Sequence, residues 1–175
     1  MSICWPLIAR TQVNVLQASM LHIAILSVVQ SLVTIAFQGW AGRVTDTIGR
    51  KPALTIFRIS LITVPLTYAF APNMETLIAV GAFWGITMAL GNAAVTAYIL
   101  DIAPEEHRGS FAAVFNLMIG ITTFFGSLLG GYLSAYTIGV FGLITGLQIV
   151  YMISMSGRII GALLHFRLKE TLKKS

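Results

Sequence analysis

The chain has 175 residues, of which 57% are hydrophobic and only 10% are charged. A soluble domain of this size usually carries about a quarter charged residues, so this chain has too little polar surface to cover a water-soluble globule. The net charge is +5, but the basic residues cluster at the ends of apolar runs instead of forming one patch, which indicates an integral membrane protein without a nucleic-acid partner.

Apolar runs long enough to cross a bilayer follow one another along the chain. Segment 1–9 is apolar but too short to span, and 10–17 is polar and predicts a loop or the start of a helix. No alternating barrel pattern appears, so the sequence predicts an all-α, polytopic membrane helix bundle in one transmembrane domain, 1–175. The expected spans are about 18–41, 53–71, 76–100, 110–134 and 140–164.

The segments between these spans are short. Gly39–Pro52 gathers three of the 11 basic residues around one acid, and its glycines predict a tight charged turn. Compact turns are also expected at 71–75 and, without charge, at 135–139. A second charged loop is expected at 101–109.

The distribution of Lys and Arg gives an orientation. If 42–51 is cytoplasmic, only Arg10 lies on the opposite side, so the positive-inside rule predicts an outer N-terminus and a cytoplasmic C-terminus. We interpret 1–9 as the stub of a missing preceding helix, with a five-helix protein that inserts N-terminus outward as the alternative. The cytoplasmic side would hold Arg43, Arg50, Lys51, Arg108, Arg167, Lys169, Lys173 and Lys174.

The first charged segment carries a recognisable motif. Gly42, Asp46, Gly49, Arg50 and Lys51 resemble the Gly-x-x-x-Asp-(x)-x-Gly-Arg-Lys signature of major facilitator superfamily transporters. In that family the signature lies in the cytoplasmic loop between the second and third helices of a six-helix half. The charge distribution assigns this loop to the same side independently.

The second charged loop resembles the same transporter superfamily. Asp101, Arg108 and Gly109 match an Asp-x-x-Pro-x-x-x-Arg-Gly element that follows the fourth helix of a half in the same superfamily. The resemblance implies about five transmembrane helices, the second to the sixth, of one half. The tail 169–172 resembles the sequence found after either half, and we favour the C-terminal one.

The resemblance implies part of a secondary active transporter that moves a small solute across the cell membrane by alternating access. The charged residues of both loops would form a conformational latch, with Asp46 accepting from Arg50 or Arg108. A second transporter half or self-association would complete the carrier. The alternatives are a non-transporting membrane module, such as a degenerate fragment or assembly partner, and an intramembrane enzyme, for which no catalytic motif is found.

Polar side chains within the spans are candidates for a substrate cavity, because a polar group in a bilayer must face a partner helix or a wet cavity. The competing interpretation is that these polar side chains form hydrogen bonds between helices. For pairs of small residues such as Gly81 and Gly85, we favour close packing of the helices. The candidate cavity-lining residues are Gln30, Gln38, Asn92, Asn116 and Gln148.

Two arginines fall inside spans. Arg58 and Arg158 are close enough to a membrane surface to extend to it, so we expect interfacial anchors, and Pro65 should kink the second span. The three histidines are scattered over different helix ends, so no metal site and no cofactor is expected.

Overall fold

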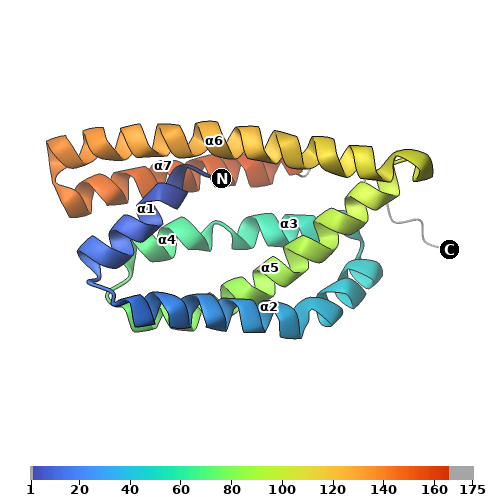
Figure 1. Cartoon of the computed structure of the whole chain (residues 1–175), viewed down its shortest axis with the longest axis horizontal. Coiled ribbons are helices and arrows are strands. Elements are labelled where there is room, and N and C mark those ends of the chain that lie inside the picture. The colour runs from blue at the N-terminus through green and yellow to red at the C-terminus, as the bar shows by residue number, and fades with distance from the viewer. Residues whose placement is uncertain (1, 166–175) are drawn as a thin grey trace.

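The computed structural model describes residues 2–165, and its regular structure there is entirely helical (Figure 1). The prediction of an all-α membrane bundle is confirmed, because five helical stretches in this range are long and apolar enough to cross a bilayer. The tail residues 169–172, used above to favour the C-terminal half, lie outside the described range.

The helices follow one another with short connections. An N-terminal segment of short helices comprises η1 (Ser2–Cys4), α1 (Trp5–Arg10) and the π-helical η2 (Thr11–Val15). The membrane-length stretches are formed by α2 (Met20–Ile48), α3 (Arg50–Ser60) with α4 (Thr63–Phe70), α5 (Met74–Ile102), η3 (Glu105–His107) with α6 (Arg108–Phe141), and α7 (Leu143–His165).

Two of the long helices begin at a side-chain cap. The Ser19 hydroxyl accepts the His22 backbone N–H at 3.3 Å at the start of α2. The side-chain amide oxygen Oδ1 of Asn73 accepts the Thr76 N–H at 2.9 Å at the start of α5. Such caps satisfy N–H groups that have no partner within the helix, so these polar residues fix where each span begins.

The prediction of a glycine-rich turn at Gly39–Pro52 is wrong for most of this segment. Helix α2 continues through the motif to Ile48, because Gly39 and Gly42 are tolerated within a helix supported by its neighbours. Only Gly49 interrupts it, with φ of 106°, a conformation that glycine adopts without steric cost. The turn between the first two spans is therefore one residue long.

The uncharged turn expected at 135–139 is also wrong. This segment is helical within α6, and the chain reverses at Gly142, where φ is +81°. The Thr137 hydroxyl donates to the Leu133 carbonyl at 2.9 Å and lies 3.1 Å from the Gly146 carbonyl oxygen of α7. Because these bonds satisfy the polar side chain within the helices, it does not need to form a turn.

The helices run back and forth so that the charged segments share one end of the molecule (Figure 1). We call this the charged end; it holds the α2–α3 junction and the loop between α5 and α6, on the right in the figure. Helix α2 packs along α5, and α6 packs along α7. Helix α6 lies at the edge of the bundle, where its most apolar 18-residue stretch has no buried residue.

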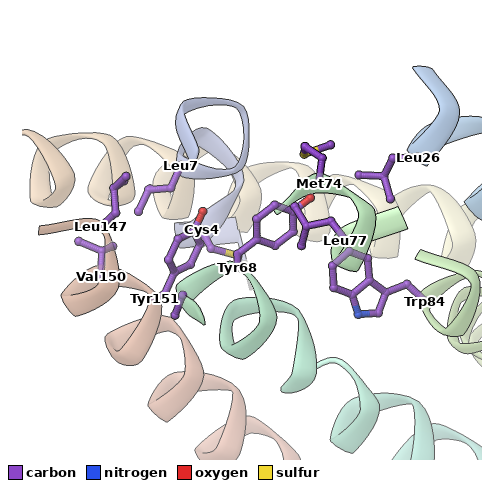
Figure 2. Close-up of a cluster of buried hydrophobic side chains, with 11 residues drawn as sticks. Cys4, Leu7, Leu26, Tyr68, Met74, Leu77, Trp84, Leu147, Val150 and Tyr151 are labelled. Carbon is purple, nitrogen blue, oxygen red and sulfur yellow. The ribbon is translucent and has the colours of Figure 1, made fainter. Parts of the chain in front are cut away.

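Two groups of buried side chains hold the bundle together. The first, drawn in Figure 2, is rich in large side chains, and its rings stack, with the Tyr68 centroid 5.5 Å from that of Trp84 and 6.1 Å from that of Tyr151. The second lies nearer the charged end and consists of small residues and leucines. Its members are Ala41, Ala53, Leu54, Ala89, Leu90 and Ala94.

Small residues let α5 approach α2 closely, as the sequence indicated for Gly81 and Gly85. A Cβ atom on Gly81 would lie 2.6 Å from the Leu26 side chain. One on Gly85 would lie 2.7 Å from the Gln30 carbonyl oxygen, which is backbone and cannot move aside easily. These two glycines thus serve helix packing instead of lining a cavity.

Candidate functional site

Arg50 is the centre of an ion-pair network at the charged end. Its Nη1 lies 2.5 Å from Asp46 Oδ1, and its Nε lies 3.1 Å from Asp101 Oδ2. Nη1 also donates to the Thr45 carbonyl at 3.1 Å. One guanidinium group therefore joins the end of α2, the start of α3 and the end of α5.

The electrostatics of these helix ends explain the arrangement. The Thr45 carbonyl is one of the last four of α2, which have no donor within the helix, and Arg50 satisfies it. Asp101 sits in the last turn of α5, where the helix dipole disfavours a negative charge, and the guanidinium of Arg50 offsets this. Arg50 is only 12% exposed, compared with 28% for Asp101 and 68% for Asp46, so Asp101 is the better shielded partner.

The remaining latch residues fall around this network. Gly42 lies inside α2, Gly49 forms the break, and Lys51 follows as the second residue of α3. Arg108 and Gly109 begin α6, and Arg108 Nη2 lies 3.5 Å from Glu105 Oε1, between exposed side chains. The structure thus brings Asp46, Arg50 and Asp101 together and places Arg108 in a separate surface pair, with a partner that sequence reasoning did not name.

The five candidate cavity amides do not converge on one site. Gln38, Asn92 and Asn116 are exposed on α2, α5 and α6, and Gln30 is half-buried where α2 meets α5. Gln148 alone reaches across the bundle, because its Nε2 donates to the Ala69 carbonyl of α4 at 3.0 Å.

A cluster of neutral polar groups at the end opposite the charged end was missed. The Thr11 and Tyr151 hydroxyls lie 2.7 Å apart, and Gln12 Nε2 donates to the Tyr68 hydroxyl at 2.9 Å. All four side chains are buried, and with Gln148 we call them the polar cluster. A cavity of about 20 Å³ is lined by members of this cluster other than Gln12, and it has room for one water-sized group.

The sequence predicted a loop or the start of a helix at 10–17, and inward-facing residues were not sought there; the structure is helical at Thr11–Val15. The signal that could have found the cluster is the pair of tyrosines in otherwise apolar spans, since a buried tyrosine hydroxyl normally has a hydrogen-bond partner. The partners themselves lie up to 140 residues away in the chain, as Thr11 does from Tyr151.

The expectation that Arg158 anchors α7 at the membrane surface is wrong. Its side chain is buried, with 7% of the residue exposed, and Nη1 donates to the Leu61 carbonyl at 2.8 Å. Nη2 lies 3.1 Å from Cys4 Sγ of the N-terminal segment. Groups inside the bundle thus take the place of the water that would solvate Arg158 at the membrane surface. Arg58, by contrast, is only partly buried and lies against the Phe57 ring.

Fold and site define a multi-pass membrane protein with its ion pairs at one membrane end. Among the described residues no group of three or more metal-ligating side chains is found. Residues 1–173 match the Major Facilitator Superfamily, and the chain belongs to this family of membrane transporters, which are not enzymes.

Individual relatives cover part of the chain. An uncharacterized MFS-type transporter of Methanocaldococcus jannaschii is 36% identical over 92 residues, 53% of this chain and 23% of that protein. The galactose-proton symporter of Escherichia coli is 35% identical over 94 residues, 54% of this chain and 19% of the symporter. A D-xylose transporter of Levilactobacillus brevis is 30% identical over 78 residues, 45% of this chain and 17% of that transporter. The chain thus matches about a fifth of the length of these relatives.

Proposed function

We propose that this chain contributes its membrane helices to a secondary active transporter that moves a small solute by alternating access. Membership of the transporter family supports this, and the network around Arg50 is the observation that carries it. A network that joins three helix ends through one side chain can hold them in one arrangement and release them together when the bonds break. The network would act as the conformational latch.

We propose a neutral, hydroxyl-bearing solute. Two of the relatives are named for galactose and D-xylose, which are neutral sugars. The described Asp and Glu residues all lie in loops or near helix ends, so no carboxylate of the described residues lies in mid-span to bind a cationic solute.

A partner would complete the carrier, either a second six-helix half or a second copy of this chain. Helix α6 buries little of its surface, and an apolar groove of about 450 Å³ lies between α5 and α6. Exposed aromatic and aliphatic side chains that line this groove could pack against helices of a partner. They include Ile102, Phe111, Val114 and Met118.

We further propose that the carrier lies in the cell membrane with the charged end and the C-terminus in the cytoplasm. The excess of Lys and Arg at that end supports this orientation.

The latch is tested by uptake of labelled D-galactose and D-xylose into cells that express the chain with a transporter half supplied from a relative. Asp46→Asn should lower uptake several-fold while the amount of protein inserted in the membrane stays the same, because it weakens the pair with Arg50 without removing the side chain. Glu105→Gln, which removes a charge from the exposed pair with Arg108, is the matched control and should leave uptake unchanged. Unchanged uptake by Asp46→Asn would sink the latch proposal.

A further inference from the structure

The second span is interrupted between α3 and α4, and a proline explains the interruption. Leu61 and Ile62 separate the two helices, and the Ile62 N–H bonds to the Ile59 carbonyl at 3.0 Å, one residue closer than in an α-helix. Pro65 follows Leu61 by four residues. Because proline has no N–H, the Leu61 carbonyl loses the donor that a continuous helix would provide.

The freed carbonyl lies deep in the membrane. Leu61 is 11 residues from Arg50, the first residue of α3, which corresponds to about 16 Å along a helix and to the middle of a hydrocarbon core of about 30 Å. No lipid group can donate to a carbonyl there, so the protein must supply the donor. Arg158 of α7 does so at 2.8 Å.

The junction between α3 and α4 also separates the two groups of buried side chains. Ala53 and Leu54 of α3 belong to the small-residue group near the charged end, whereas Tyr68 and Ala69 of α4 belong to the aromatic group. Through its bond to Cys4, the guanidinium of Arg158 ties the N-terminal segment to the same point. The side chain therefore holds the junction between two separately packed parts of the bundle.

We infer that Arg158 is a positioning residue: it replaces the backbone donor that Pro65 removes and so holds the junction between α3 and α4. A buried charge in an apolar span is otherwise costly, and the carbonyl is a reason for its presence. This role does not depend on transport, because it concerns the junction between α3 and α4 and can be measured on the purified chain.

The test is a double-mutant cycle on the purified chain in detergent, read out as reversible unfolding by SDS. Arg158→Met should shift the unfolding equilibrium on the order of tenfold or more, because it leaves a buried carbonyl without a donor. In a Pro65→Ala background the residue 65 N–H can bond to Leu61, so the same substitution should shift the equilibrium at least about fivefold less.

Arg58→Met is the matched control, since it removes the other arginine of the spans and should cause the same shift with either residue at position 65. Equal shifts for Arg158→Met in the two backgrounds would overturn the inference, because a merely structural loss is indifferent to position 65. If Arg158→Met does not fold, Arg158→Lys serves in the same cycle, with amide exchange at 61–66 as the measurement. Faster exchange that Pro65→Ala does not reverse would count equally against the inference.

Discussion

The two ends of the bundle solve the problem of buried polar groups differently. At the charged end, Arg50 joins three helices through two carboxylates and one carbonyl, and the helices behind it meet through alanines and leucines. At the opposite end, neutral hydroxyls and amides pair among stacked rings, as Thr11 does with Tyr151. Charge therefore holds one end, and aromatic packing with neutral hydrogen bonds holds the other.

This difference indicates which end of the bundle is better suited to a change of conformation. Ion pairs near a membrane surface can exchange their partners for water at modest cost, because the high dielectric there stabilises separated charges. Hydroxyls buried in the bundle have no such alternative, and breaking them leaves unsatisfied groups. We therefore expect the charged end to be the one that switches between states, and the aromatic end to remain packed.

The largest effect is expected when Arg50 is replaced, which removes the centre of the charged end. Arg50→Gln should lower the free energy of unfolding by about 2–3 kcal/mol, since Asp101 and the Thr45 carbonyl lose a shielded charged donor. Asp101→Asn should cost more than Asp46→Asn, because Asp101 is less exposed. SDS unfolding of the purified chain measures each value.

Arg43→Gln is the control for this set, because Arg43 is an exposed arginine at the same end. It should change stability by less than about 0.5 kcal/mol. Equal losses for Arg43→Gln and Arg50→Gln would show that net positive charge, and not the network, stabilises this end.

Much of the fold could be predicted from the sequence, because apolar runs of membrane length identify spans without any knowledge of packing. The two motifs also placed Asp46, Arg50 and Asp101 in one candidate site, and Arg50 or Arg108 was the expected partner of Asp46. The pair between Arg50 and Asp101 was not named from the sequence. Helix ends were harder. The glycines at 39 and 42 were read as turn signals although only Gly49 has the conformation that requires glycine.

The rest depends on how the helices are rotated and packed. A span that is apolar all round gives no periodic pattern to show which face points inward. The pairing of Thr11 with Tyr151 and of Arg158 with Leu61 joins residues 140 and 97 positions apart, and neither follows from local spacing. The same holds for the amides: Asn92 and Asn116 are exposed in this chain, and their place at a cavity stays a prediction.

A smaller effect is expected at the aromatic end. Tyr151→Phe keeps the ring and removes the hydroxyl that bonds to Thr11, so it should lower the free energy of unfolding by about 1 kcal/mol. Tyr132→Phe on the exposed face of α6 is the control and should have almost no effect, because Tyr132 is 73% exposed. If both variants lose the same stability, the buried bond does not distinguish this end from the lipid-facing surface.

The smallest effect is expected for Arg108, and it decides whether the latch extends beyond the Arg50 network. Its pair with Glu105 joins side chains that are 45% and 87% exposed, so Arg108→Ala should change the free energy of unfolding by less than about 0.5 kcal/mol. Uptake by the assembled carrier should likewise stay near the unsubstituted level, because Arg108 pairs apart from Arg50. A several-fold loss of uptake with unchanged stability would mean that Arg108 joins the latch in another conformational state. The latch would then include the start of α6 as well as the network around Arg50.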